Sequence, residues 1–422
     1  MVASRVLVVA LLAAMGLSDP GDFANGSELA VDRFSDLAQC ESVGLSACPQ
    51  PFDVVLPPAE TMLSWDQRSR VIGFRNTYRL YMEGRTYRLA DYLRRQDVTG
   101  LLILKDQRVV YEHYGSGNTD KTLWTSRSVA KSIVSILVGM AIKEGLIGSV
   151  TDPITRYLPE LKGSACDGVS VRDLLQHTSG VAWNEHYADP NSDFARLTRC
   201  EASPEAYQCV LQLVGTLKRM PGVRPGEVWS YNTGGAWLLG RVLEKATGMT
   251  IAHYLETRLW SRYAMQSDGV WEALVKGQVD FGGHGFNATL RDWGRFGLFV
   301  AGGGKLSDGE ELLPSDWIAQ SVTWSKAKGS VTPETPDGQF GYQWWFGGVD
   351  PSRRDSDDVT RTAKQSFWAE GIYGQTIAID RAEKLVMVQW STWKEAETPT
   401  SLYDEQALFF EAVARELGGL KR

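Results

Sequence analysis

The chain has 422 residues, of which 43% are hydrophobic and 23% are charged, a composition typical of folded globular proteins rather than disordered ones. The net charge of −7 argues against nucleic acid as a partner, because an acidic surface repels the phosphate backbone. A single hydrophobic core rarely grows beyond about 250–300 residues, so we expect two lobes or domains.

The N-terminal segment predicts export. Arg5 precedes an apolar stretch over 6–16, and the small residues near Ala14–Gly16 are typical of a cleavage site. The stretch is shorter than the roughly 20 apolar residues that cross a bilayer, so we expect a signal peptide over 1–18 and no stable membrane insertion. A buried or frayed strand is the alternative. Export would place the protein in the periplasm. We also expect an irregular N-terminal extension over 19–60.

Five cysteines offer two short-loop pairs. In an oxidising compartment, Cys40 would pair with Cys48 and Cys200 with Cys209, which leaves Cys166 over. Five reduced thiols in a cytosolic protein are the alternative. The sequence has no CxxC motif and no zinc-like spacing of Cys and His, so we expect no metal site.

Strand patterns lie near both ends of the chain and helical patterns dominate its middle. In chain order, the expected elements are a helix over Trp65–Met82, a β-hairpin of Gly100–Lys105 and Val109–His113, helices over Ser128–Leu146, Val171–His177 and Ala236–Thr247, strands over Tyr342–Phe346, Ser366–Ala369, Gln375–Ile379 and Leu385–Trp390, and a helix over Ser401–Leu417. We therefore expect a domain over 61–422. Its α/β lobe would comprise 61–125 and 286–422, with a helical lobe over about 126–285 inserted between them.

The pattern Ser-x-x-Lys indicates where the chemistry lies. It occurs three times, and only Ser128 and Lys131 open a long apolar helix. Residues three apart on a helix are neighbours, so the amine of Lys131 can reach the hydroxyl of Ser128. Burial would lower the pKa of Lys131, and a neutral amine can accept the serine proton. On this motif alone, the alternative is a helix-capping serine followed by a lysine that extends into solvent.

Tyr231 is a second candidate. It follows the turn at Pro225-Gly226 and precedes an apolar helix. A phenol beside a protonated lysine can pass a proton to a leaving group, whereas a core tyrosine is the alternative. No serine lies in a GxSxG motif, and neither HExxH nor a Walker A motif occurs.

Taken together and in order, Ser128-x-x-Lys131, the segment LLQHTSG over 174–180 and Tyr231-x-Thr233-Gly resemble the serine β-lactamase-like and penicillin-binding-protein-like hydrolases. That family covers class C β-lactamases, D,D-peptidases, family VIII esterases and 6-aminohexanoate-dimer hydrolases. The resemblance runs from about 98 to 415. It implies an α+β fold of the β-lactamase/transpeptidase type, in which an antiparallel sheet is flanked by helices and carries an inserted all-helical lobe. It also implies Ser128 as the nucleophile, Lys131 as its base and Tyr231 as the proton relay.

The 6-aminohexanoate-dimer hydrolase branch is the most similar part of this family. Three segments carry that likeness: 183–190, Gly282–Gly285 and Gly371–Gln375. They imply substrate-binding roles for Tyr187, His284 and Tyr373. An exposed aromatic side chain and an ordinary loop histidine are the alternatives for Tyr187 and His284.

The family's Lys-Thr-Gly motif aligns with Ala369-Glu370-Gly371. Because the lysine that helps to hold the substrate carboxylate in β-lactamases is absent, β-lactam hydrolysis is in doubt. The resemblance places the oxyanion hole at the backbone N–H groups of Ser128 and Ile372. Each such donor can contribute about 3–4 kcal/mol to acyl transfer. Tyr342, Trp344, Trp345, Trp368 and Trp390 either line a groove or belong to the core.

These features predict a serine hydrolase that cleaves a small amide or ester through an acyl-enzyme on Ser128, with no metal and no cofactor. A carboxylesterase of the family VIII type, a D,D-peptidase or a β-lactamase are alternatives within the same class. A non-catalytic relative that binds peptidoglycan is an alternative of another class. The oligomeric state stays open, with a homodimer as one option.

Overall fold

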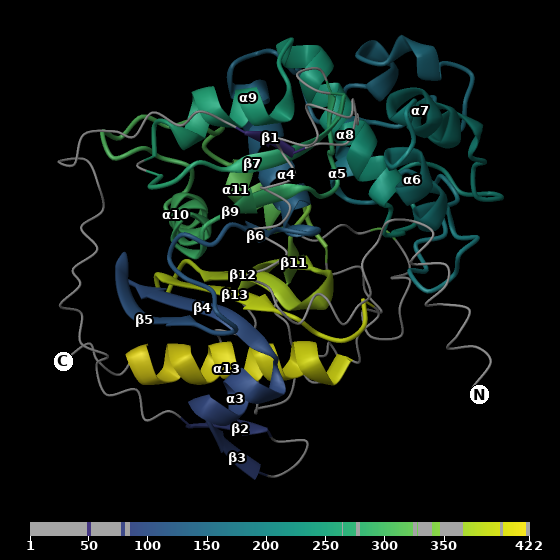
Figure 1. Cartoon of the computed structure of the whole chain (residues 1–422). Helices are drawn as coiled ribbons and strands as arrows, with labels where there is room; N and C mark the ends of the chain where they lie inside the picture. Colours follow the sequence, from purple (N-terminus) through teal and green to yellow (C-terminus); the bar gives the residue numbers. More distant parts are fainter. Residues whose placement is uncertain are drawn as a thin grey trace, which may run out of the picture.

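The computed structural model describes residues 49–51, 77–80, 85–263, 265–275, 279–323, 327, 340–346, 366–396 and 400–418. The predicted signal peptide, Cys40 and Cys48 lie outside these residues. The described chain folds around one large antiparallel sheet with helices on both faces (Figure 1). The predicted α+β class is therefore confirmed.

The large sheet is built from both ends of the chain. Its strand order is β10-β11-β12-β13-β4-β5, where the strands are β10 (Trp345–Phe346), β11 (Phe367–Gly371), β12 (Gln375–Asp380), β13 (Leu385–Ser391), β4 (Val98–Lys105) and β5 (Arg108–Tyr114). The ladder between β13 and β4 joins the two ends and runs from the pair Leu385 and Lys105 to the pair Trp390 and Gly100. The predicted hairpin corresponds to β4 and β5, and the predicted late strands to β10–β13.

Alternate residues of these strands face two separate cores, as the period of a strand requires. Leu101 and Ile103 pack toward α13 (Thr400–Gly418) and α3 (Leu89–Arg95), which lie below the sheet in Figure 1. Leu102 and Leu104 face the opposite core, beneath α10 (Leu290–Ala301) and α4 (Val129–Lys143). Helix α10 approaches closely because Gly294 and Gly297 face the sheet. A Cβ added at Gly297 would lie 2.6 Å from Cγ1 of Val386.

The inserted segment is mainly helical. Its elements are α5 (Val171–Leu175), α6 (Asp193–Glu201), α7 (Ala206–Thr216), α8 (Thr233–Thr247), α9 (Ile251–Leu255), the π-helical turn Glu256–Trp260, and the 3-10 turns Ile154–Arg156 and Pro159–Leu161. Helix α11 (Trp317–Ser321) follows later in the chain. Together with α4, these helices form the upper part of the molecule in Figure 1.

This lobe is not all-helical, which corrects that detail of the prediction. A second, small sheet contains β7 (Val270–Val275) and β8 (Val279–Asp280), both inside the segment that was expected to be helical; its other strands are β1 (Pro49–Pro51), β6 (Trp124–Thr125) and β9 (Phe286–Ala288). A run of six mostly apolar residues fits a buried helix as well as a strand, so its pairing partners decide.

The predicted helix over Trp65–Met82 is wrong where the structure can be compared with it. Residues Thr77–Leu80 form β2, which pairs with β3 (Arg85–Arg88) in an antiparallel hairpin. The rest of the predicted helix lies outside the described residues.

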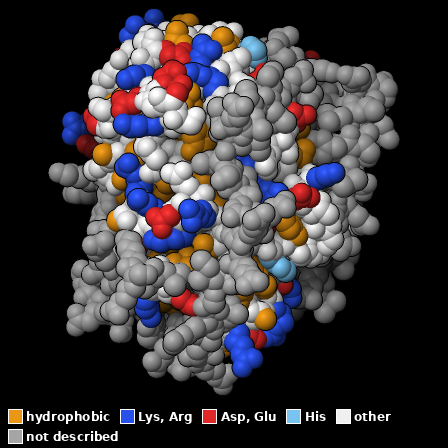
Figure 2. All heavy atoms as spheres, turned by 90° about the vertical axis from the view of Figure 1, so that its left-hand side faces the viewer, with side chains coloured by type: hydrophobic (Ala, Val, Ile, Leu, Met, Phe, Trp, Pro, Cys, Tyr) orange, Lys and Arg blue, Asp and Glu red, His pale blue; other side chains and the backbone are white. Residues whose placement is uncertain are grey.

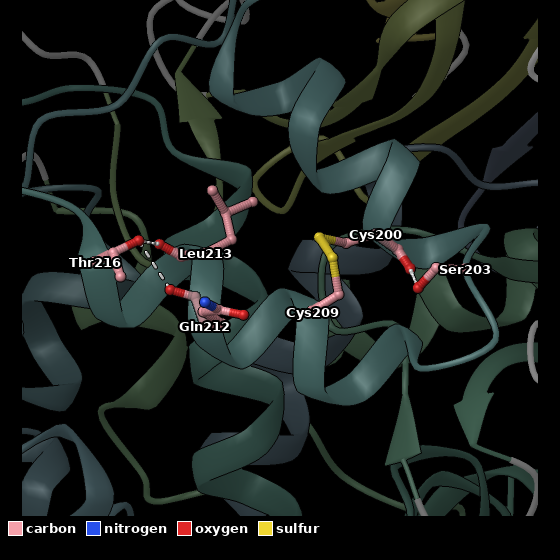
Figure 3. Close-up of a disulfide and its surroundings, with 6 residues drawn as sticks. All are labelled: Cys200, Ser203, Cys209, Gln212, Leu213 and Thr216. Atoms are coloured by element: carbon pink, nitrogen blue, oxygen red, sulfur yellow. Dashed lines mark hydrogen bonds between the residues drawn. A yellow bond between two sulfur atoms is a disulfide. The ribbon is translucent and has the colours of Figure 1, made fainter.

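One predicted disulfide is confirmed. Cys200 in α6 and Cys209 in α7 are bonded, with their Cα atoms 5.2 Å apart, and the bridge joins the two helices side by side (Figure 3). Cys166 is a free, buried thiol.

None of the described helices combines the length and the apolar character that crossing a membrane requires. On the face shown in Figure 2, the coloured acidic and basic side chains intermingle.

Candidate active site

Ser128 lies at the N-terminus of α4, with a helical backbone conformation (φ −68°, ψ −8°). Its side chain makes no capping hydrogen bond, so the structure does not support the alternative of a helix-capping serine. The preceding residue, Arg127, has a left-handed backbone (φ 46°), an uncommon conformation for a residue with a side chain. The hydroxyl is half-buried at the point where the chain enters the helix.

Lys131 turns its amine inward rather than into solvent. Its Nζ lies 3.0 Å from Oγ of Ser128 and 2.8 Å from the carbonyl oxygen of Gly283, and the residue is 3% exposed. Burial lowers the pKa of Lys131 to about 8, while the nearby carboxylates of Glu185 and Glu201 oppose part of that change. The amine is thus available in its neutral form close to physiological pH.

Tyr231 completes the predicted trio. The Nζ of Lys131 lies 5.1 Å from the centre of its ring, and the phenol forms a hydrogen bond with Ser128. Burial and the charge of Glu185 raise the pKa of Tyr231, and the hydrogen bond with Ser128 opposes part of that rise. Its ring stacks on Trp345 at 5.8 Å and contacts His177 at 4.5 Å between ring centres. The hydroxyl, the amine and the phenol therefore converge.

The end of β11 lies directly against the start of α4. A Cβ added at Gly371 would be 3.1 Å from the backbone nitrogen of Ser128 and 2.8 Å from the carbonyl oxygen of Ser126. Only glycine allows this approach. Ile372, the next residue, begins the 3-10 turn Ile372–Gly374, so this turn follows directly after the contact that Gly371 makes with Ser128.

Tyr373 lies in this turn, with a left-handed backbone (φ 64°, ψ 20°). The guanidinium carbon of Arg127 lies 5.5 Å from the centre of its ring. Because Arg127 immediately precedes Ser128, the structure places Tyr373 at the edge of the site.

Tyr187 is tied to the site through a carboxylate that the sequence analysis did not single out. Its hydroxyl donates to Glu185 at 3.1 Å. Glu185 also accepts hydrogen bonds from the backbone N–H of Thr233 (3.0 Å), the hydroxyl of Thr233 (2.5 Å) and the indole N–H of Trp183. Burial raises the pKa of Glu185, although Lys131 and these donors oppose that rise. The available signal was weak: an acidic residue two positions before Tyr187, in a segment that the structure shows as a loop.

His284 is next to the site, but its ring points toward another element. Nε2 lies 3.2 Å from Oε1 of Glu201 in α6, and the ring stacks on Phe281 with centres 4.8 Å apart. The carbonyl of the preceding residue, Gly283, is the one that contacts Lys131. Glu201 is thus a second carboxylate that sequence reasoning missed.

Glu370 occupies the middle of the Ala-Glu-Gly segment. Burial raises its pKa to about 8, and its charge acts on Tyr231 and on Tyr403 of α13. Within the described part of the chain, no basic side chain forms an ion pair with it. A carboxyl group therefore occupies the middle of the segment that the resemblance aligns with Lys-Thr-Gly.

The five aromatic residues divide between core and site. Tyr342, Trp344, Trp368 and Trp390 are buried. Trp345 is only partly buried and stacks on Tyr231, so it alone of the five contacts the predicted trio.

The described residues contain no cluster of three or more His, Cys, Asp or Glu side chains that could hold a metal ion.

Comparisons with known proteins identify the family of the chain. Residues 88–409 match the family model described as Beta-lactamase. The chain is 28% identical over 329 residues to the 6-aminohexanoate-dimer hydrolase of Paenarthrobacter ureafaciens, an alignment that covers 74% of this chain and 77% of that protein.

Solved structures show the same fold. One from Bacillus anthracis, assigned by its name to the 6-aminohexanoate-dimer hydrolases, has a TM-score of 0.73 at 20% identity and covers 92% of this chain and 95% of its own. A class C β-lactamase from Rhodobacter sphaeroides has a TM-score of 0.54 at 17% identity, covering 77% and 98%. The predicted fold and resemblance are confirmed: the chain belongs to the Beta-lactamase family and is a serine hydrolase of the β-lactamase and penicillin-binding-protein superfamily.

Proposed function

We propose that the protein cleaves small amides or esters through an acyl-enzyme on Ser128, with Lys131 as the base. The observation that carries this proposal is the contact of 3.0 Å between the buried amine of Lys131 and the hydroxyl of Ser128. A pKa of about 8 for Lys131 supports it, because an effective base has a pKa near the working pH.

In the proposed acylation step, neutral Lys131 accepts the proton of Ser128 while Oγ attacks the carbonyl carbon of the substrate. The carbonyl oxygen becomes an oxyanion that accepts hydrogen bonds from the N–H groups of Ser128 and Ile372. The proton then passes from Lys131 through the phenol of Tyr231 to the leaving nitrogen or oxygen, and the carbon–heteroatom bond breaks. The site is restored with Lys131 neutral.

In the proposed deacylation step, water attacks the ester carbonyl that links Ser128 to the acyl group. Neutral Lys131 takes one proton of the water through the phenol of Tyr231, and this proton returns to Oγ of Ser128 as the bond to the acyl group breaks and the acid product leaves. No metal or cofactor takes part in either step. Tyr187, His284 and Tyr373 are the proposed substrate contacts at the rim.

A small linear amide is the preferred substrate in this proposal, because the relative from Paenarthrobacter ureafaciens is named for hydrolysis of the 6-aminohexanoate dimer. Glu370 makes β-lactams the less favoured substrates, since this segment lacks the lysine that would attract a substrate carboxylate and carries a carboxyl group instead.

We further propose that the protein is exported to the periplasm. The bond between Cys200 and Cys209 supports this location, because structural disulfides persist in oxidising compartments.

Labelling of the purified protein with a fluorophosphonate tests the proposal directly. Intact mass should show one adduct, and peptide mapping should locate it on Ser128. The Ser128→Ala variant should remain unlabelled. An adduct on another serine, or none on the wild type, would overturn the proposal, and absence of an adduct would favour a non-catalytic binding protein.

A substrate panel then separates the activities within the class. It comprises 6-aminohexanoate dimer, short-chain nitrophenyl esters and a chromogenic cephalosporin. Turnover of the dimer supports an amidase, and turnover of the esters alone supports an esterase. Efficient turnover of the cephalosporin would support a β-lactamase instead.

A further inference from the structure

Glu185 gathers four hydrogen-bond donors from three residues. Its Oε2 accepts from the backbone N–H of Thr233 and the indole of Trp183, and its Oε1 accepts from the hydroxyls of Thr233 and Tyr187. Thr233 begins α8, two residues after Tyr231, whereas Trp183 and Tyr187 belong to the loop before α6. One carboxylate therefore connects two segments that are 48 residues apart in sequence.

Capping of α8 does not require this carboxylate. Asn232 is the N-cap residue, and its side-chain oxygen already accepts the backbone N–H of Gly235 at 2.7 Å. Removing a charged carboxylate from water is costly, and burial raises the pKa of Glu185 accordingly. The positive end of the α8 dipole and the donated hydrogen bonds offset part of this cost. A role in capping alone would not explain why a charged group occupies the position.

Glu185 lies close to the proposed base through its partner Thr233. A Cβ added at Gly283 would lie 3.0 Å from Cγ2 of Thr233 and 3.6 Å from Nζ of Lys131. Both side chains therefore border the same point, and the charge of Glu185 acts on the amine. Lys131 is contacted by Ser128 and Gly283, and the charges that act on it come from Glu185 in the loop and Glu201 in α6. The nearby ring of Tyr231 has no cationic form. The buried imidazole of His177 is uncharged, because burial lowers the pKa of His177 well below its usual value. The two carboxylates are thus the groups that stabilise the ammonium form of Lys131.

We propose that Glu185 is a positioning residue for acyl transfer: its carboxylate holds Tyr187 and the start of α8 in register and stabilises Lys131 when the amine carries the proton taken from Ser128. This inference rests on the proposed function, in which Lys131 is the base. In the transition state for acylation, positive charge develops on a buried amine. A fixed negative charge nearby favours that change more than it favours the resting neutral amine.

Glu185→Gln separates charge from geometry. The amide oxygen can still accept from Thr233 N–H and Trp183, and the amide NH₂ can donate to the hydroxyls of Thr233 and Tyr187, which also act as acceptors. We expect the melting temperature to stay close to that of the wild type. The acidic limb of the kcat/KM profile should move about one unit to lower pH, since the ammonium form loses its stabilising charge. The plateau of kcat should fall about tenfold.

Two further variants complete the test. Glu160→Gln makes the same chemical change at an exposed position of the lobe and should leave both the profile and kcat unchanged. Glu185→Ala removes geometry as well as charge and should lower kcat further, with a rise in KM because Tyr187 is released. If Glu185→Ala does not fold, Glu185→Gln alone decides.

The inference is overturned if the acidic limb of Glu185→Gln lies at the same pH as that of the wild type, even if kcat falls. A loss of packing can lower kcat, but it does not change the pH at which Lys131 titrates. Fluorophosphonate labelling of wild-type Ser128 is measured in parallel. If wild-type Ser128 is labelled but the acidic limb of Glu185→Gln stays in place, only the role of Glu185 is refuted. If wild-type Ser128 is not labelled, the proposed function itself is refuted.

Discussion

The Nζ of Lys131 lies 2.8 Å from the carbonyl oxygen of Gly283, a residue 152 positions later in the chain. A neutral amine has two N–H bonds and one lone pair. When one N–H donates to Gly283, the lone pair can turn toward Oγ of Ser128, 3.0 Å away. This carbonyl is therefore part of what would make Lys131 a directed base rather than a mobile charge.

The activity should rise with pH as Lys131 loses its proton. Burial lowers the pKa of Lys131 to about 8, and only the neutral amine can accept the serine proton, so the acidic limb of kcat/KM should lie near pH 8. Initial rates between about pH 5.5 and 10 check this expectation. Lys131→Met should abolish the limb together with turnover. A wild-type profile that is flat from pH 6 to 9 would contradict the role of Lys131.

Ser128→Ala should remove nearly all turnover and leave the fold intact. Loss of a serine nucleophile in related mechanisms costs about 10⁴-fold or more in kcat. The hydroxyl makes no capping hydrogen bond, so the melting temperature should hardly change. Steady-state kinetics and thermal unfolding measure the two effects, and residual turnover at a tenth of the wild-type rate would exclude Ser128 as the nucleophile.

Tyr231→Phe should slow amides more than activated esters. The phenyl ring can keep its stacking on Trp345 and its contact with His177, so the change removes chiefly the hydroxyl. An amine leaving group needs a proton, whereas nitrophenolate does not. We expect kcat for an amide to fall about 10²–10⁴-fold and kcat for a nitrophenyl ester to fall much less. Equal losses on both substrates would remove Tyr231 from the proton path.

Glu370 should make stability depend on pH. Its folded-state pKa of about 8 lies above its usual value of 4.5, so the folded protein holds this proton where the unfolded chain has released it. The contribution of Glu370 to the free energy of unfolding is therefore largest below about pH 4.5, and it declines as the pH rises through about 8. Glu370→Gln should lose less stability than the wild type between pH 5 and pH 9.

Urea unfolding at the two pH values measures this difference. The change in free energy of unfolding between them is compared for the two proteins, so any constant effect of the substitution cancels. Identical pH dependence in both would show that Glu370 titrates normally in the fold.

The disulfide should stabilise the helical lobe. A bond between Cys200 and Cys209 closes a loop with a sequence separation of nine residues, for which the entropic model predicts about 2–3 kcal/mol. A double Cys200→Ser/Cys209→Ser variant should unfold at lower denaturant concentration. Adding a reductant should lower the stability of the wild type toward that of the variant. A reductant-insensitive wild type with an unchanged midpoint in the variant would contradict this role.

Local patterns in the sequence were sufficient for several features. The spacing of Ser128 and Lys131 predicts their contact, because residues three apart on a helix are neighbours whatever surrounds them. The apolar runs over 100–105 and 109–113, separated by the polar residues 106–108, predict the hairpin that β4 and β5 form. The sequence analysis did not predict the short strand β7, because six mostly apolar residues do not distinguish a strand from a buried helix.

The sequence by itself therefore determined the contact between Ser128 and Lys131, the candidate phenol, the family and the strand-rich ends of the chain. Only the tertiary structure decided that Glu185, Glu201 and Gly283 surround Lys131, and that the partly buried Glu370 lies near enough to Tyr231 for its charge to act on the phenol. The physical reason is that a pKa depends on burial and on charges in space. Lys131, Glu201 and Glu370 come from α4, α6 and β11, and the other groups come from loops. Nothing in the spacing of these residues along the chain reveals that they meet.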